Sequence, residues 1–228
     1  DSKKSGGVTI SHLRFGKEPI RSTYLIKKAN FVACHNPSYV DKYDMVSDLK
    51  EGGTFLLNCG WDLEELEQKL PAKMKKIIAE RNIKLYTIDG VTIAKEIGLG
   101  NRVNTVLQAA FFKLANIIPI EDAVKFMKDA IVASYGKKGE NIVNMNFAAV
   151  DQGIEKVKEV KVPAHWAQAS ADEEAAATKD VPEFIKNILE PMNRQEGNNL
   201  PVSAFVGRED GTFPQGTAKY EKRGIAVD

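Results

Sequence analysis

The sequence predicts an α/β protein in which a mostly parallel sheet is flanked by helices, with a β-hairpin at the start of the chain and an extended arm at its end. Two observations lead to this class. Short apolar segments alternate with stretches of helical apolar spacing between residues 31 and 88, and helical spacing alone follows residue 89. A strand–helix–strand order of this kind is typical of parallel sheets with right-handed crossovers and helices on their faces.

The first half of the chain carries the expected strands. Residues 8–13 and 21–26 are rich in β-forming residues, and Gly16 and Pro19 between them favour a turn, so we expect a β-hairpin there. Three further strands are expected, with helices between them. The strands are 31–35, 54–58 and 83–88, and the helices are 39–49 and 63–79. This order predicts a Rossmann-like layer, whose ligands lie beyond the carboxyl ends of the strands.

The second half is expected to be helical, without further strands. The helices predicted by apolar spacing are 91–97, 101–118, 120–135 and 140–160, with a short helix at 183–192. Residues 164–180 have the composition of a linker, and residues 194–228, rich in glycine and proline, are expected to form an extended arm that needs a partner surface. We therefore predict an α/β domain at 1–163, followed by linker, helix and arm at 164–228.

Composition limits the classes of function. Among 228 residues, 32 basic side chains nearly balance 31 acidic ones, for a net charge of +1, so general attraction to nucleic acid or to anionic membranes is not expected. No apolar run approaches the length of a membrane span, and the first residues do not resemble a signal peptide. We expect a cytoplasmic protein with no nucleic-acid or membrane partner. Because the chain does not begin with methionine, we also expect a piece of a longer protein.

The glycine-rich segment from Gly98 to Asn104 is the leading candidate binding site. It ends one predicted helix and opens another, which places backbone N–H groups beside the Arg102 guanidinium and the Asn104 amide, an arrangement that suits a phosphate group. Glycines also join helices without any ligand. Arg102 could equally cap the carbonyls of the preceding helix or pair with Glu96. The Asn104 amide could hold a phosphate or the backbone of a neighbouring domain.

Other reactive residue types carry no predicted chemistry. Cys34 and Cys59 lack the spacing of a zinc or iron–sulfur site, so we expect reduced thiols in the core and no metal in this chain. His12, His35 and His165 have no partner at a spacing that indicates a catalytic triad. We expect no catalytic residue here.

Several sequence blocks closely resemble the gamma-type domain of pyruvate:ferredoxin (flavodoxin) oxidoreductases. The resemblance covers almost the whole chain. Its clearest blocks are SHLRFG at 11–16, ACHNP at 33–37, GTFLLN at 53–58, the GLG-x-R-x-N segment at 98–104, YGKKG at 135–139 and LPVSAF at 200–205. Two departures stand out, because the family's domain begins upstream with a strand and a glycine-rich loop, and a cysteine-rich ferredoxin-like region follows where this chain stops.

The resemblance implies that this domain binds coenzyme A and presents its thiol to a two-carbon intermediate during oxidative decarboxylation of pyruvate to acetyl-CoA. By position, the coenzyme A contacts would be Lys3, Arg102 and asparagines of the 144–146 segment, Asn144 and Asn146, with Asn104 beside them. Thiamine diphosphate, Mg and [4Fe–4S] clusters would belong to other domains of a homodimeric parent enzyme that passes electrons to ferredoxin or flavodoxin. The isolated chain is then expected to be inactive. The alternative is a scaffold that docks the other domains without binding a ligand of its own.

Overall fold

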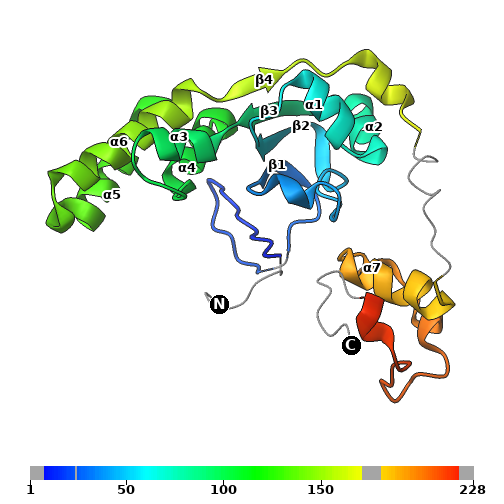
Figure 1. Ribbon diagram of the computed structural model, residues 1–228. Coiled ribbons are helices and arrows are strands. Elements are labelled where there is room, and N and C mark those ends of the chain that lie inside the picture. Colours follow the sequence, from blue (N-terminus) through cyan, green and yellow to red (C-terminus); the bar gives the residue numbers. More distant parts are fainter. Residues whose placement is uncertain (1–7, 24, 171–180, 221–228) are drawn as a thin grey trace. The chain divides into compact units, whose positions relative to one another are not determined.

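The computed structural model describes residues 8–23, 25–170 and 181–220. The chain divides into two compact units, one formed by residues 13–171 and the other by residues 1–12 with 172–228. The predicted domain boundary at 163–164 stays a prediction. The first unit holds the sheet and most helices (Figure 1).

A four-stranded sheet in the order β1-β2-β3-β4 forms the centre of the larger unit. The strands are β1 (Ala29–Cys34), β2 (Leu49–Asn58), β3 (Lys84–Ile88) and β4 (Lys158–Val160). The first three are parallel, and β4 pairs with β3 in the antiparallel sense. The predicted α/β class with a mostly parallel sheet is confirmed.

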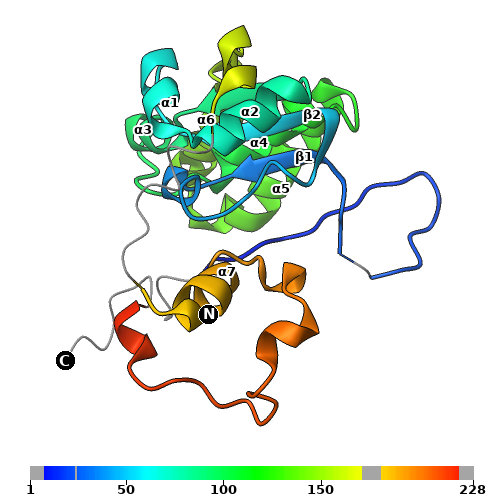
Figure 2. The ribbon, with the colours of Figure 1, turned by 90° about the vertical axis from the view of Figure 1, so that its right-hand side faces the viewer.

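Helices cover both faces of this sheet because successive β2 residues point to opposite sides. Phe55 and Leu57 pack in a cluster with α1 (Leu63–Lys69) and α2 (Ala72–Glu80), whereas Leu56 packs in a second cluster. The helices of that second face are α3 (Gly90–Glu96), α4 (Asn104–Ala115) and α6 (Glu140–Glu155). Helix α5 (Ile120–Tyr135) contributes Met127 and Ile131 to a third cluster with α4 and α6 residues. Figure 2 shows the layers from the side.

The buried amide of Asn58 forms hydrogen bonds with backbone groups at the carboxyl ends of the strands. Its Nδ2 donates to the His35 carbonyl at 2.9 Å, and its Oδ1 accepts from the Gly90 backbone N–H at 2.9 Å. Only 4% of Asn58 is exposed. One side chain at the end of β2 therefore joins the residue after β1 to the first turn of α3.

Several predicted elements were wrong, for local reasons. The expected β-hairpin is absent, since the described residues between 8 and 26 hold no strand. The predicted helix 39–49 is only a 3₁₀ turn, η1 (Pro37–Tyr39), followed by a turn in which Asp44 accepts hydrogen bonds from the Ser47 backbone and hydroxyl. The predicted helix 63–79 is split into α1 and α2, because Pro71 lacks an N–H and Leu70 before it is extended.

The predicted helix 140–160 also ends early, and the expectation of no strand after residue 89 was wrong. Helix α6 stops at Glu155, and β4 follows. The residues from Val157 to Val162 place valine at every second or third position, a pattern that favours an edge strand. The 101–118 helix is shorter than predicted, since α4 begins at Asn104 and ends before Asn116, whose φ of 47° is left-handed.

The smaller unit has little regular structure in its described residues. Helical turns run through 183–193, as η6 (Ile185–Leu189) and α7 (Glu190–Asn193), which agrees with the predicted short helix. The arm is not extended throughout. It contains the short 3₁₀ helices η7 (Gly197–Asn199), η8 (Val202–Phe205) and η9 (Thr217–Tyr220), and the Phe213 ring packs edge-on against Phe184 at 5.3 Å.

Candidate functional site

The loop between α3 and α4 turns at its two glycines. Gly98 and Gly100 have φ values of +85° and +63°, which other residues rarely adopt. The Leu99 N–H donates to the Ala94 carbonyl at 2.8 Å, and its side chain is buried, so the loop is held to the core at its middle. Gly98 also lies close to α6, because a Cβ there would stand 3.0 Å from the Met145 sulfur.

The N-terminus of α4 is open at the end of this loop. Val103 precedes the helix and supplies no side-chain cap. Within residues 8–23, 25–170 and 181–220, the backbone N–H groups of Asn104, Thr105 and Val106 donate no hydrogen bond to the chain. Unsatisfied N–H groups and the positive end of the helix dipole favour an anion at this position.

Arg102 lies beside this open helix end. Its side chain is exposed, and in the described part of the chain it makes no ion pair or hydrogen bond. The predicted alternative, a pair with Glu96, is absent from the described residues, where the Glu96 carboxylate instead bonds the Lys156 amine at 3.1 Å. Only the Arg102 backbone N–H is engaged, with the Leu99 carbonyl at 3.2 Å. The guanidinium is therefore available to an anion in solution.

The asparagines divide into exposed and buried members. Asn104 and Asn144 are exposed, whereas only 6% of Asn146 is exposed. The Asn146 Nδ2 donates to the Ile142 carbonyl at 2.9 Å, and its Oδ1 accepts from the Thr105 hydroxyl at 3.3 Å. Asn146 thus positions the start of α4 against α6. Thr105, which the sequence reasoning missed, is its partner 41 residues away, and no local pattern signals such a pairing.

The structure brings Arg102 and Asn104 to one end of α4, with Asn146 behind them. Asn144 is exposed on the same helix as Asn146, and in the part of the chain that the structure describes no hydrogen bond joins it to Arg102. Lys3 lies outside the described residues. The site is therefore an exposed loop and helix end, built from consecutive residues and supported from α6.

Both cysteines are buried thiols, as predicted. Cys34 is 3% exposed and Cys59 is 7% exposed, and both are free. Burial raises the pKa of each thiol to about 11, so both stay protonated at neutral pH and are poor nucleophiles. Their contribution is packing at the carboxyl ends of β1 and β2.

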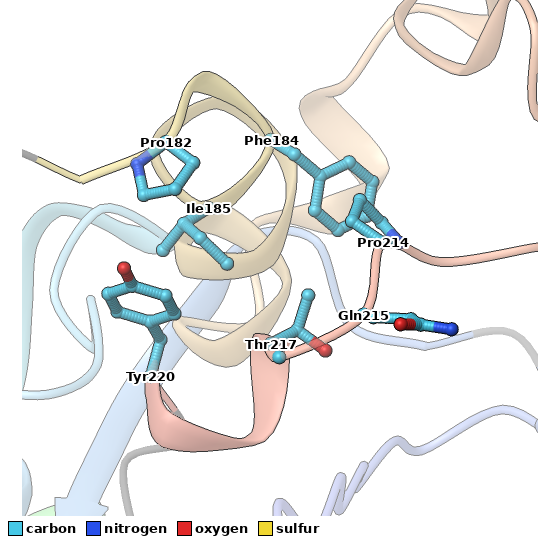
Figure 3. Close-up of a pocket in the computed structure, with 8 residues that line it drawn as sticks. Pro182, Phe184, Ile185, Pro214, Gln215, Thr217 and Tyr220 are labelled. Atoms are coloured by element: carbon cyan, nitrogen blue, oxygen red, sulfur yellow. The ribbon is translucent and has the colours of Figure 1, made fainter.

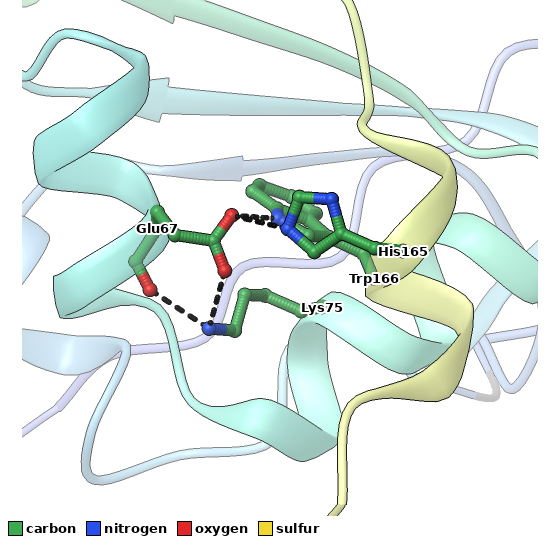
Figure 4. A network of polar contacts seen from close by, with 4 residues as sticks. All are labelled: Glu67, Lys75, His165 and Trp166. Atoms are coloured by element: carbon green, nitrogen blue, oxygen red, sulfur yellow. Dashed lines mark hydrogen bonds and ion pairs between the residues drawn. The ribbon is translucent and has the colours of Figure 1, made fainter.

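His165 belongs to a polar cluster that fixes the segment after β4. In Figure 4, the Glu67 carboxylate of α1 accepts hydrogen bonds from the Trp166 indole and, at 3.0 Å, meets the His165 ring. Lys75 of α2 donates to the Glu67 carbonyl at 2.7 Å and lies 3.2 Å from its carboxylate. Trp166 itself is fully buried. We call these four residues the Glu67 clasp. Its contacts hold the segment after β4 against α1 and α2, which is a structural role.

The Glu67 clasp predicts a pH dependence of stability. The Trp166 hydrogen bond, helped by Lys75 and His165, lowers the pKa of Glu67 below its ordinary value of 4.5. A lowered native pKa contributes stability above the ordinary pKa, and that contribution is lost as pH falls through the native value. Glu67→Gln is therefore expected to make the loss of unfolding free energy below about pH 4.5 less steep, as measured by urea titrations at successive pH values.

Glu64→Gln is the matched control, since Glu64 is an exposed carboxylate of the same helix. It should leave the slope unchanged. A Glu67→Gln profile that is parallel to the wild-type profile down to about pH 3 would contradict the assigned role of the clasp.

A separate hollow lies within the smaller unit (Figure 3). Its volume is about 150 Å³, and its lining is mostly apolar, formed by Pro182, Phe184, Ile185, Pro214, Thr217 and Tyr220 among others. Pockets that enclose drug-sized ligands hold roughly 300–1,000 Å³. This hollow is smaller than such pockets, and none of the described residues of the predicted site lines it.

The fold and the loop define a class: an α/β domain with a mostly parallel sheet and an uncapped helix N-terminus after a glycine-rich loop. Comparison with known proteins gives the family. Residues 1–156 match the family described as pyruvate ferredoxin/flavodoxin oxidoreductase, and residues 170–226 match a family described as EKR, a domain of unknown function. The chain belongs to the pyruvate ferredoxin/flavodoxin oxidoreductase family, which confirms the family predicted from the sequence.

Curated relatives match along the whole chain. It is 58% identical over 228 residues to the pyruvate:ferredoxin oxidoreductase of Moorella thermoacetica and 56% identical to a pyruvate-flavodoxin oxidoreductase of Enterobacter agglomerans, with 100% of this chain and 19% of each relative covered. It is also 45% identical to a pyruvate dehydrogenase [NADP(+)] of Cryptosporidium parvum, of which it covers 13%. The chain thus spans about a fifth or less of the length of these relatives.

Among solved structures, the chain is similar to the PORC subunit of a pyruvate oxidoreductase from Thermotoga maritima. The TM-score is 0.46 at 20% sequence identity, over 60% of this chain and 67% of that one. No helix of the described residues is long and apolar enough to cross a membrane.

Proposed function

We propose that this chain is the part of a pyruvate:ferredoxin or pyruvate:flavodoxin oxidoreductase that binds coenzyme A. The assignment to this enzyme is supported by the activities for which the relatives are named. The assignment of the ligand is supported by a single observation, the uncapped α4 N-terminus beside the unpaired Arg102. Coenzyme A supplies the thiol that accepts the acetyl group. The role of this chain is to hold that thiol in reach of a two-carbon intermediate bound elsewhere in the enzyme.

The residues present fit the phosphates of coenzyme A. A guanidinium binds a phosphate through two parallel hydrogen bonds, and the three unsatisfied N–H groups of α4 would donate to an anion at the helix N-terminus. Gly100 has open space around it, so a ligand can approach the backbone closely. Asn104 adds an exposed amide, Asn146 positions the helix, and Asn144 and Lys3 stay predicted contacts.

The other cofactors are assigned to parts of the enzyme outside this chain. Thiamine diphosphate with Mg would hold the pyruvate-derived intermediate, and [4Fe–4S] clusters would pass electrons to ferredoxin or flavodoxin. In the described residues, no group of three or more His, Cys, Asp or Glu is arranged to hold a metal ion. We place the whole enzyme in the cytoplasm as a homodimer.

A calorimetric titration tests the ligand directly. The full-length enzyme is titrated with coenzyme A and with dephospho-coenzyme A, as wild type and as Arg102→Ala. A charge-assisted contact contributes about 1.5–3 kcal/mol when shielded and less when exposed, so Arg102→Ala is expected to raise the Kd for coenzyme A by about 5- to 50-fold. If Arg102 binds the 3′-phosphate, removal of the guanidinium and removal of the 3′-phosphate each cost the same part of the binding free energy. The two losses then do not add when Arg102→Ala is titrated with dephospho-coenzyme A.

Lys125→Ala is the matched control, since it removes an exposed positive charge from α5. It should leave the Kd unchanged. An Arg102→Ala enzyme that binds coenzyme A with wild-type affinity would refute the proposed contact.

A second candidate function is an interdomain scaffold. The observation that favours it is the exposure of apolar side chains in the arm, where Val202 is 90% exposed and Val206 is 75% exposed. On this hypothesis the arm packs on neighbouring domains and the anion site of α4 is incidental. Unchanged coenzyme A binding in both the Arg102→Ala and Lys125→Ala enzymes, together with loss of domain association in a Val202→Asp enzyme, would favour the scaffold.

A further inference from the structure

The segment from Leu13 to Leu25 displays apolar side chains to solvent. We call residues 13–23 and Leu25 the strap. Four of its large apolar side chains are at least half exposed: Leu13 (64%), Phe15 (54%), Ile20 (50%) and Leu25 (65%). Its described residues form no strand. Figures 1 and 2 show the strap as an open loop that precedes β1, the first strand of the sheet.

One aromatic side chain of the strap, close to its bend, packs against the α/β unit. The Phe15 ring stacks on Phe111 of α4 with centroids 6.3 Å apart, and Phe111 meets Phe31 of β1 edge-on at 5.1 Å. Aromatic pairs in this range are attractive. The bend at Lys17 and Glu18 follows Phe15 closely in the sequence, so this ring contact holds the chain beside α4 close to the bend.

The charge of this region is one-sided. Residues 13–28 contain a single acidic residue, Glu18, against five basic residues, which are Arg14, Lys17, Arg21, Lys27 and Lys28. Lys17 and Arg21 are exposed and lie on either side of Ile20 and Pro19. Protein interfaces combine an apolar centre with a polar rim, and their charges are complementary. A partner of the strap would therefore carry an apolar centre surrounded by carboxylates.

We propose that the strap is a docking element for an acidic, apolar-centred surface on another part of the same enzyme polypeptide. The chain spans only 19% of the Moorella relative, so most of the protein surface available to the strap lies in the remaining sequence. Covalent connection raises the effective concentration of such a partner, and a short apolar segment then suffices for stable docking. This inference goes beyond coenzyme A binding and does not depend on it.

Hydrogen exchange of the full-length enzyme, followed by mass spectrometry, tests the docking. Amides of residues 16–18, 20 and 21 should exchange at least about tenfold more slowly than the reference rate of an unstructured peptide. The double variant Lys17→Glu/Arg21→Glu should lose most of that protection. The matched variant Lys125→Glu, which reverses an exposed charge on α5, should keep it, and so should Arg102→Ala. Exchange at the reference rate in the wild-type enzyme would overturn the proposal.

Cross-linking identifies the occupant. A photoreactive residue at position 20 of the full-length enzyme should yield cross-links to an acidic segment outside this chain. In enzyme assembled from a mixture of unlabelled (light) and isotope-labelled (heavy) polypeptides, a cross-link within one polypeptide should give only light–light and heavy–heavy products. Mixed products would place the partner on the second subunit, and cross-links to residues 181–220 would place it within this chain; either result overturns the assignment.

Discussion

Trp166→Ala is expected to lower the free energy of unfolding of the α/β unit by about 3–5 kcal/mol. Trp166 is fully buried and packs in the cluster of α1 and α2 with Leu66, Leu70 and Met74. Truncation leaves a cavity in this face of the sheet. It also removes the indole N–H from the Glu67 carboxylate, which then loses a hydrogen-bond donor in a half-buried position.

Chemical denaturation of the purified chain, monitored by far-ultraviolet circular dichroism, measures this loss. Trp166→Phe is the informative comparison, because it keeps most of the buried ring and removes only the donor. We expect it to cost roughly a third of the alanine effect, in keeping with about 1–3 kcal/mol for one unmade bond. A Trp166→Ala chain within about 1 kcal/mol of wild type would show that the segment after β4 is not part of the core.

Gly153→Ala is expected to destabilise the unit by about 1–3 kcal/mol, although alanine is the better helix former. Gly153 lies inside α6, where a Cβ would stand 2.4 Å from the Val106 carbonyl oxygen and 2.9 Å from the Ala109 Cβ. Backbone atoms cannot give way cheaply, so α4 and α6 must separate. The gain in helix propensity, at most about 1 kcal/mol, is smaller than this steric cost.

The same substitution should weaken the proposed ligand site. Separation of α4 from α6 disturbs the Thr105–Asn146 contact at 3.3 Å, and with it the open end of α4. We therefore expect both a lower midpoint of urea unfolding and a weaker coenzyme A affinity in the full-length enzyme. Gly136→Ala is the control, since its nearest neighbour to an added Cβ is 3.9 Å away and its φ is −54°. A Gly153→Ala chain as stable as Gly136→Ala would contradict the close packing of the two helices.

The spacing of apolar residues predicted burial better than it predicted secondary structure. Val40, Tyr43, Val46 and Leu49 recur at helical intervals and are all buried, yet only a 3₁₀ turn and irregular turns carry the first three. Proline at 37 and the Asp44–Ser47 hydrogen bonds favour turns over a continuous helix. The periodicity of apolar residues therefore predicts which side chains face the core. The local conformation depends in addition on side chains that form hydrogen bonds with backbone groups in place of helical ones.

The candidate site shows the same division. A helix start beside Arg102 and Asn104 follows from local chemistry, so the sequence predicted it, although α4 begins at Asn104 and not at residue 101. The roles of Asn144 and Asn146 could not be separated in that way, because one turns outward and the other bonds Thr105 on a different helix. The prediction of a β-hairpin was wrong because a strand needs a partner with which to pair. The β propensity of residues 8–26 does not indicate whether such a partner is present.

The amide at position 58 restricts what evolution can place there. It offers a donor to the His35 carbonyl and an acceptor to the Gly90 N–H from adjacent atoms of one small side chain. Aspartate, of nearly the same shape, would set a carboxylate against a carbonyl oxygen, and leucine would leave both backbone groups unsatisfied. We therefore expect relatives that keep this strand end to carry an amide side chain between the two backbone groups.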